Sequence, residues 1–256
     1  MSSKKSQSQS QSQTISKESI QRLVKYVKHI IKNPLTDNNI YYKHDEEDML
    51  KGYALIIGPA DTPYFGGFYF FDFNFPVNYP HAPPTVTYKT NGERIRFNPN
   101  LYTSGKVCIS LLNTWKGEQW TSCQSISTIL LTLCTLLCNN PLLNEPGVTN
   151  TNHRDFCNYN TIIEYKNIDI AILHMINKSP HIYQESFEIF YDIIKESFKN
   201  NYEKLLSIVN KMVEEYKDKD TDDINISTTM YSMITTLNYK KLQQQLIKIH
   251  SSLQQV

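Results

Sequence analysis

Apolar positions near the start of the chain recur with the period of an amphipathic α-helix. The residues that share this face are Ile20, Leu23, Val24, Val27, Ile30 and Ile31. Lysines occupy the other side of the pattern, which stops at Asn33-Pro34 because proline cannot donate a backbone hydrogen bond and disfavours helical geometry in the residue before it. The spacing predicts one helix that ends at this dipeptide.

The next part of the chain alternates apolar and polar residues with the period of two that is typical of β-strands. Four segments carry this pattern: NIYYKH, MLKGYALIIGP, GGFYFFDFNFP and TVTYKT. In the third segment, Phe71, Phe73 and Phe75 alternate with Asp72 and Asn74. Short turns containing Gly or Pro separate the segments, so the sequence predicts four sequential strands in an antiparallel meander.

Helical spacing returns after Trp120. Between residues 126 and 138 one apolar face is suited to cover the sheet, and the opposite stripe consists of Thr128, Leu131, Thr132 and Thr135. Beyond residue 160 the pattern stays helical, up to a last amphipathic segment at about 237–253. Because strands and helices are segregated along the chain, the fold class is α+β. We expect an N-terminal helix, the four-stranded sheet, covering helices and a C-terminal helical extension.

Composition limits the classes of partner. The chain has 256 residues with 26 Lys and Arg against 25 Asp and Glu, and the net charge of +1 creates no bulk field for nucleic acid or an anionic membrane. Residues 1–13 form a Ser/Gln-rich tail with too little apolar area to offset the entropy of ordering, so we expect disorder there. No segment approaches the roughly 18 uninterrupted apolar residues of a membrane span. We expect neither nucleic acid nor a membrane as partner.

The cysteines indicate a reducing compartment. They are Cys108, Cys123, Cys134, Cys138 and Cys157. Their odd number, and a pair four positions apart inside an apolar run, are unlike the framework of a secreted disulfide protein. We expect free thiols in a cytoplasmic protein, with nuclear entry left open.

Cys108 has the most informative surroundings. It lies between a Gly-Lys turn and an apolar run in the stretch FNPNLYTSGKVCISLL. Pro99 stiffens the loop between Asn98 and Asn100, and Gly105 permits a turn that returns Cys108 toward that loop. Local composition alone favours a buried structural thiol. The alternative is a nucleophile beside an amide donor.

A thiol and a carboxamide suit acyl transfer through a thioester. The thiolate is the attacking species, with an ordinary thiol pKa of about 8.5, and a carboxamide can hydrogen-bond the oxyanion of a tetrahedral intermediate. An acyl group that arrives already as a thioester needs no strong general base, in agreement with the lack of a histidine near Cys108 in the sequence. Such chemistry requires no metal or other cofactor.

Four stretches, in this order, resemble the catalytic domain of the ubiquitin-conjugating enzymes: YFGGFYFFDFNFPVNYPHAPPTVTY, RFNPNLYTSGKVCISLLNTWKGEQW, QSISTILLTLCTLLCNNP and NEPG. The resemblance is strongest to the large subgroup with an NPN loop and a helical C-terminal extension, some of whose members accept ubiquitin-like modifiers. It implies a catalytic domain at 14–177, after the tail at 1–13, and a helical extension at 178–256. It also implies an enzyme that receives ubiquitin or a ubiquitin-like modifier from an activating enzyme and transfers it to a lysine of a protein substrate, usually with a ligase.

The resemblance assigns roles around the nucleophile. Cys108 matches the thioester-forming cysteine, and Asn100 matches the amide that stabilises the oxyanion or the loop. Asn98 stands where most of the family has a histidine that braces the loop. Residues 141–147 match a gate whose side chain orients or desolvates the attacking lysine, with Asn144 and its acidic neighbour Glu145 as candidates.

Two surfaces are implied in the same way. Leu131, flanked by Thr128 and Thr135, matches the helix position against which the bound modifier folds back. The candidates for ligase contact are His81, Trp120, Thr121 and Ser122. Relatives that pair with RING ligases usually carry a phenylalanine in the Pro-rich loop and Ser-Pro-Ala after the tryptophan, so the departure here implies an unusual ligase or ligase-independent transfer.

Three other interpretations compete. A zinc site would use Cys134, Cys138, His153 and Cys157, but the helical spacing assigns the first two to the core face. A cysteine hydrolase would pair Cys108 with His153 and would need an ordered oxyanion hole. A non-catalytic adaptor of the same fold is the most serious alternative, and the presence of both Cys108 and Asn100 argues against it.

Overall fold

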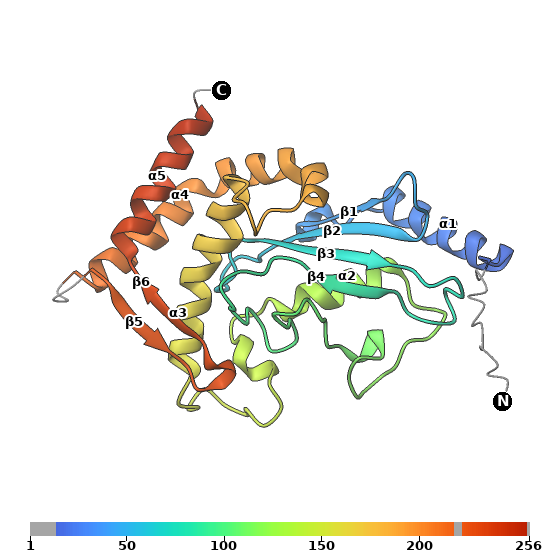
Figure 1. The fold of residues 1–256 in the computed structure, drawn as a ribbon, viewed down its shortest axis with the longest axis horizontal. Helices are drawn as coiled ribbons and strands as arrows, with labels where there is room; N and C mark the ends of the chain where they lie inside the picture. The colour runs from blue at the N-terminus through green and yellow to red at the C-terminus, as the bar shows by residue number, and fades with distance from the viewer. Residues whose placement is uncertain (1–13, 218–221, 255–256) are drawn as a thin grey trace, which may run out of the picture.

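The computed structural model describes residues 14–217 and 222–254, so the tail predicted at 1–13 lies outside the described residues. Figure 1 shows the four-stranded sheet between the N-terminal helix at one end of the molecule and the C-terminal elements at the other. This arrangement agrees with the predicted α+β class.

The N-terminal helix α1 (Lys17–Lys32) ends where the sequence predicts, just before Asn33-Pro34. Ser16 caps it by accepting a hydrogen bond from the Ser19 amide at 3.0 Å. Leu23 and Ile30 are buried, whereas Ile31 is 67% exposed. The helix therefore buries only part of its predicted apolar face, because it packs along the edge of the sheet domain and not across its middle.

The sheet consists of β1 (Ile40–His44), β2 (Lys51–Ile57), β3 (Phe68–Asn74) and β4 (Thr85–Tyr88). The strands lie in the order β1-β2-β3-β4 and every neighbouring pair is antiparallel, which confirms the predicted meander. In the central strand, Phe71 is opposite Ala54 on one side and Tyr88 on the other. Side chains therefore alternate between two faces of the sheet.

One face of the sheet packs against α2 (Ile126–Leu136) in the first of two hydrophobic cores. Phe71 and Phe73 share this core with Ile129 and Leu133 of the helix. The helix starts at Ser125, whose hydroxyl accepts a hydrogen bond from the Thr128 amide at 3.3 Å. The predicted covering helix is confirmed, and its other stripe is left facing solvent.

The opposite face of the sheet is also buried, over β2 and β3. Leu55, Ile57, Phe68 and Phe70 are each at most 3% exposed and belong to a second core shared with C-terminal elements. The ring of Phe70 stacks on that of Phe187 with centroids 3.8 Å apart and planes 11° from parallel. An antiparallel sheet often leaves one face in water. Here the C-terminal extension covers it.

The extension contains a short 3₁₀ helix (Glu185–Phe190), α4 (Tyr191–Glu215) and α5 (Tyr239–Gln254), with the hairpin of β5 (Ile224–Ser227) and β6 (Ile234–Leu237) between the two long helices. The predicted helical extension is confirmed, but the hairpin within it was not predicted. Its strands are only four residues long, so their alternation is too short to identify them from the sequence. No helix in the described segments has both the length and the apolar composition needed to cross a membrane.

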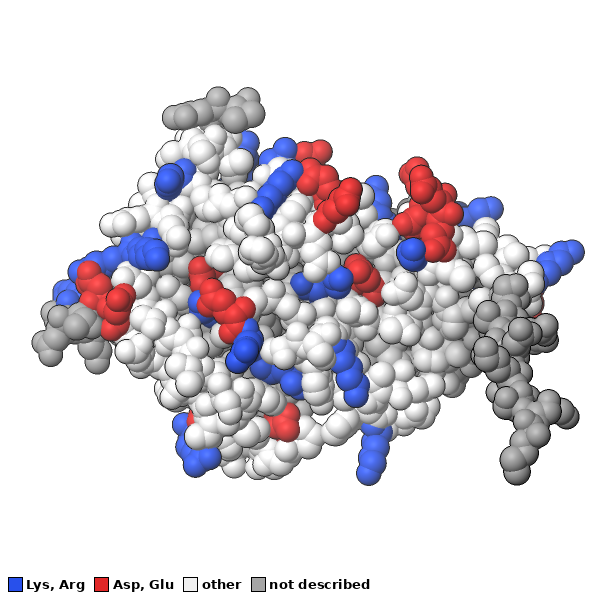
Figure 2. All heavy atoms as spheres, in the orientation of Figure 1, with Lys and Arg blue, Asp and Glu red and all other residues white. Residues whose placement is uncertain are grey.

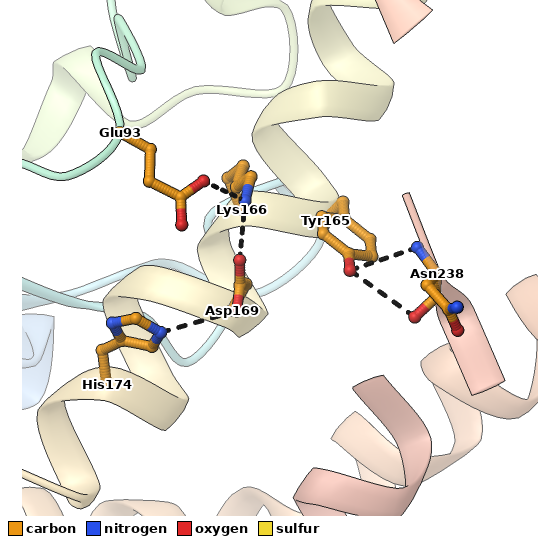
Figure 3. A network of polar contacts seen from close by, with 6 residues as sticks. All are labelled: Glu93, Tyr165, Lys166, Asp169, His174 and Asn238. Atoms are coloured by element: carbon orange, nitrogen blue, oxygen red, sulfur yellow. Dashed lines mark hydrogen bonds and ion pairs between the residues drawn. The ribbon is translucent and has the colours of Figure 1, made fainter. Parts of the chain in front are cut away.

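A network of polar contacts surrounds α3 (Phe156–Lys166) and the π-helical segment Asn167–His174 that continues it, and one of these contacts reaches the extension (Figure 3). The Lys166 ammonium is 2.5 Å from the Glu93 carboxylate and 2.7 Å from that of Asp169, with its side chain only 5% exposed. Burial alone would lower the pKa of Lys166, but the two carboxylates outweigh it and raise that pKa. On the residue before Lys166, the Tyr165 hydroxyl accepts a hydrogen bond from the Asn238 amide at 3.2 Å, just before α5. The boundary predicted at residue 178 therefore falls within a continuous packed structure.

Candidate active site

A buried asparagine braces the NPN loop. Asn98 is fully buried, and its Nδ2 donates hydrogen bonds to the Leu136 carbonyl at 2.7 Å and to the Tyr64 hydroxyl at 3.3 Å. Its Oδ1 accepts from the Asn100 amide at 2.9 Å. Asn98 thus connects the loop to the end of α2, which is the bracing role that the sequence predicts for this position.

Cys108 returns to this loop through a tight turn. Gly105 has φ of +88°, and a Cβ there would lie 2.9 Å from Thr87 Cγ2, so both conformation and space favour glycine. After the turn, the Cys108 amide donates to the Asn100 carbonyl at 2.9 Å. The predicted return of Cys108 to the NPN loop is confirmed.

The thiol of Cys108 is nearly covered but makes polar contact. The residue is 4% exposed, and its Sγ donates to the Thr114 carbonyl at 3.1 Å. The Thr114 hydroxyl in turn accepts from the Ile109 amide at 2.9 Å and donates to the Val107 carbonyl at the same distance. The sulfur is therefore nearly covered by protein but hydrogen-bonded to the main chain, and its surroundings are polar as well as apolar.

The Asn100 carboxamide lies against the main chain of Cys108. Its Nδ2 donates to the Cys108 carbonyl at 2.6 Å, while its Oδ1 is buried without a hydrogen-bond partner. Of the two roles predicted for Asn100, this bond supports loop stabilisation directly. It also places the side-chain amide of Asn100 beside the residue that carries the thiol.

Cys108 faces a cavity of about 60 Å³ lined also by Pro99, Asn100, Tyr102, Trp115, Asn144, Glu145 and Pro146. The lining brings a thiol, a carboxamide and a carboxylate together. Such a site can admit an amine to an acyl group on the sulfur.

Both predicted gate residues lie at this cavity. Asn144 ends a short 3₁₀ helix (Pro141–Asn144), and its Nδ2 is 3.4 Å from the Leu136 carbonyl, which Asn98 also contacts. Glu145 is half-buried, and its Oε2 accepts a hydrogen bond from the Tyr231 hydroxyl. The acidic candidate therefore borders the nucleophile, and a residue of the C-terminal hairpin holds it.

The predicted modifier-binding stripe is exposed on α2. Leu131 is 41% exposed, and Thr128 and Thr135 beside it are exposed as well. The Thr135 hydroxyl donates to the Thr132 carbonyl at 2.7 Å, so part of the stripe's polarity is satisfied within the helix. The sequence pattern thus identified the solvent-facing side of α2.

Of the four candidates for ligase contact, three are at least partly exposed and Trp120 is buried. His81 and Thr121 are exposed, and Ser122 is half-buried with its carbonyl accepting from the Tyr26 hydroxyl at 3.2 Å. Trp120 is only 8% exposed, and its indole N–H donates to the Pro80 carbonyl at 2.7 Å. Because its ring is buried, Trp120 positions the loop that carries His81 and offers little surface of its own.

The residues of the proposed zinc and hydrolase sites are not assembled. In the described part of the chain, no three His, Cys, Asp or Glu side chains come together as a metal site would need. Cys134 is half-buried against the core, while Cys138 lies beyond the end of α2 at Leu136, so the expected core position of Cys138 on the helix was wrong. His153 is absent from the lining of the Cys108 cavity.

Sequence reasoning missed four residues around the site. Trp115 is 47% exposed at the mouth of the cavity, and the motif LNTW was the available signal for it. Arg96, Tyr102 and Tyr231 form a stack in which the Arg96 guanidinium lies 3.4 Å from the Tyr102 ring centre and 4.8 Å from that of Tyr231. Arg96 and Tyr231 lie in distant parts of the sequence, so no local pattern could pair them.

Comparison with known proteins agrees with this geometry. The family model described as ubiquitin-conjugating enzyme matches residues 22–167. Ubiquitin-conjugating enzyme E2 Z of Xenopus tropicalis is 37% identical over 196 residues, which make up 73% of this chain and 62% of that protein. The E2 Z of Homo sapiens is 42% identical over 165 residues, 61% of this chain and 47% of that protein. Probable ubiquitin-conjugating enzyme E2 24 of Arabidopsis thaliana is 32% identical over 225 residues, 84% of this chain and 24% of that protein.

The chain thus spans less than two thirds of the length of these relatives. The family match, however, covers more than half of the chain and includes the sheet, Cys108 and every residue that lines its cavity. This chain belongs to the ubiquitin-conjugating enzyme family.

Proposed function

We propose that the chain is a cysteine-dependent conjugating transferase that carries ubiquitin or a ubiquitin-like modifier on Cys108. The observation that carries this proposal is the cavity in which the Cys108 thiol meets the Asn100 carboxamide and the Glu145 carboxylate. A purely structural thiol would have no need of this polar lining. Membership of the family and the printed names of the relatives support the same activity.

The chemistry would proceed in two acyl transfers. In the first, the Cys108 thiolate attacks the modifier's C-terminal carbonyl, held as a thioester on the activating enzyme, and that enzyme's thiolate leaves. In the second, a lysine amine attacks the Cys108 thioester, the C–S bond breaks and Cys108 leaves as thiolate, while the amine gives up a proton. The ATP is spent upstream, by the activating enzyme. The Glu145 carboxylate lines the same cavity as Cys108, and in this proposal it orients the amine and accepts its proton.

The proposal is tested with the wild-type chain. It is incubated with activating enzyme, ATP and ubiquitin and run on a non-reducing gel, and the adduct is mapped by proteolysis and mass spectrometry. We expect an adduct that disappears with thiol reductant and maps to Cys108. Absence of any thiol-sensitive adduct, with ubiquitin and with ubiquitin-like modifiers, would favour the non-catalytic adaptor.

Replacing Asn100 by alanine should separate the two transfers. Thioester formation should persist, and single-turnover discharge to lysine should slow about 100-fold, the lower end of what loss of one oxyanion donor costs. Asn201→Ala is the matched control, because its Nδ2 also donates to a main-chain carbonyl, that of Ser197 at 2.9 Å, but in α4. Discharge at the wild-type rate in Asn100→Ala would limit Asn100 to the loop bond seen here.

Replacing Leu131 by arginine should slow discharge without affecting thioester formation. The exposed leucine offers an apolar contact to the carried modifier, and a charge there would have to be desolvated on docking. We expect about a tenfold lower rate of discharge to lysine, since the loss of a well-packed apolar contact costs about 1–3 kcal/mol. Ile247→Arg on α5 is the matched control, because Ile247 is 42% exposed against 41% for Leu131. Equal discharge rates in both variants would remove Leu131 from the modifier surface.

We also propose that His81 and Thr121 belong to a surface that contacts a ligase. We further propose that the protein acts in the cytoplasm, where thiols are kept reduced. The exposed imidazole of His81 stands where a phenylalanine would serve RING ligases in the family, and it lies 3.8 Å from the Glu18 carboxylate. All five cysteines are free, including the exposed Cys123 and Cys157. Free exposed thiols suit a compartment where they stay reduced.

A further inference from the structure

The C-terminal hairpin reaches the active site with its turn. In Figure 1, β5 and β6 run beside α3, and the connection between them lies near the start of that helix. The turn is fixed by Asp155, whose Oδ2 accepts from the Thr229 hydroxyl at 2.6 Å and from the Met230 amide at 2.8 Å. Farther along, the Asn158 amide group donates to the Ser227 carbonyl at 2.9 Å. The turn is therefore anchored to α3 at several points.

Tyr231 is held at this turn in an unusual conformation. Its φ of 61° and ψ of 5° lie in the left-handed region, which bulky residues adopt only when their surroundings impose it. The following Met233 is buried, and its sulfur accepts a hydrogen bond from the Arg96 amide at 3.3 Å. The backbone geometry thus turns the Tyr231 ring toward the NPN loop.

The ring of Tyr231 supports the loop through Arg96. The Arg96 guanidinium lies between the rings of Tyr231 and Tyr102, and its NH2 group donates to the Pro99 carbonyl at 2.6 Å. Its Nε donates to the Asn98 carbonyl at 3.2 Å. Two of the three NPN carbonyls are therefore held by one side chain that the hairpin helps to position.

The hydroxyl of the same tyrosine holds the gate. It donates to Glu145 Oε2, so the second carboxylate oxygen is left for the cavity that Glu145 shares with Cys108. Burial of Tyr231 and the neighbouring Glu145 carboxylate raise the pKa of its hydroxyl, so this hydroxyl stays a donor even in alkaline buffer. One residue of the extension thus contacts Glu145 at the cavity and Arg96, whose side chain supports the NPN loop.

We propose that Tyr231 is a positioning residue for the lysine-transfer step. It fixes the Glu145 carboxylate at the cavity and, through Arg96, fixes the NPN loop opposite. This inference rests on the proposed function. It makes the C-terminal hairpin part of the active site and assigns the extension a role in the second transfer.

Tyr231→Phe tests this positioning role because it removes the hydrogen bond to Glu145 and keeps the ring over Arg96. We expect thioester formation at the wild-type rate and discharge to lysine slowed about tenfold, within the roughly 100-fold that a 1 Å misplacement can cost. The matched control is Tyr53→Phe, which removes a tyrosine–carboxylate bond to Asp45 at 2.8 Å outside the cavity and should leave both rates unchanged. Thermal melting of each variant confirms that it is folded.

A double-mutant cycle with Glu145→Ala distinguishes positioning from general stabilisation. If Tyr231 acts through Glu145, adding Tyr231→Phe to Glu145→Ala should change the discharge rate no further. If the two substitutions slow discharge by the product of their separate factors, or if Tyr231→Phe discharges at the wild-type rate, the positioning role of Tyr231 is overturned while the proposed function stands. Failure of the wild type to form a thioester would instead overturn the proposed function and this role with it.

Discussion

Cys108→Ala is expected to abolish the thioester adduct entirely. The thiol is the only group in the cavity that can carry an acyl chain as an energised ester, because the neighbouring carboxamide and carboxylate are not nucleophiles of this kind. Cys108→Ser should give an oxygen ester instead, which forms slowly and resists thiol reductant. Both results are measured by charging with activating enzyme, ATP and ubiquitin on reducing and non-reducing gels.

The matched controls are Cys123→Ala and Cys157→Ala, which remove the two exposed thiols. We expect normal charging in both, because neither residue lines the Cys108 cavity. An adduct that persists in Cys108→Ala and is lost in one of the controls would place the acceptor elsewhere. The melting curves of Cys108→Ala and the wild type should overlay, since the substitution removes only one sulfur and its hydrogen bond to the Thr114 carbonyl.

Deleting residues 178–256 is expected to leave a protein that aggregates or melts about 10 to 20 °C lower. The deletion strips the rings of Phe187 and Phe190 from Phe70 and opens the second core. Re-exposing Phe68 and Phe70 of the sheet alone costs about 3 to 6 kcal/mol, a large share of the 5–15 kcal/mol that stabilises a typical domain. At this size each kcal/mol shifts the melting temperature by about 2–4 °C. Size-exclusion chromatography and thermal melting measure the result.

Two substitutions in the full chain test the same interface without removing it. Phe187→Ala should cost about 3 kcal/mol, because it leaves a cavity over Phe70. Ile189→Ala, at a position 47% exposed in the same short helix, should stay within about 0.5 kcal/mol. A truncated chain that stays monomeric and melts like the full chain would make the extension an independent module.

These two predictions concern different parts of the chain, yet the structure connects them. The extension that covers the sheet with Phe187 also carries Tyr231 to the gate at Glu145. Loss of activity on truncation would therefore have two causes: exposure of the second core, and loss of the hydrogen bond from Tyr231 to Glu145. Tyr231→Phe separates them because it leaves the second core intact.

Local pattern was sufficient for the first helix, the four-stranded sheet and α2, whereas for Cys108 it left a structural thiol and a nucleophile as alternatives. The helix at 17–32, the four strands and the solvent stripe of α2 all follow from periods of 3.6 and 2, which each segment carries by itself. The site was found because Asn98, Asn100 and Cys108 lie within one short stretch, so a stiff loop and a glycine turn suffice to bring them together. Resemblance to a family then supplied the chemistry.

What the sequence by itself determined is therefore the first helix, the four strands of the main sheet and α2, with their order, and one short stretch that brings Asn100 and Cys108 together as the candidate site. Only the tertiary structure decided which surfaces those elements cover. It placed the extension on the second face of the sheet, formed a hairpin from two four-residue strands, and brought Tyr231 to Arg96 and Glu145. The physical reason is that periodicity records which side of an element is apolar, whereas contacts between distant segments depend on how the whole chain packs.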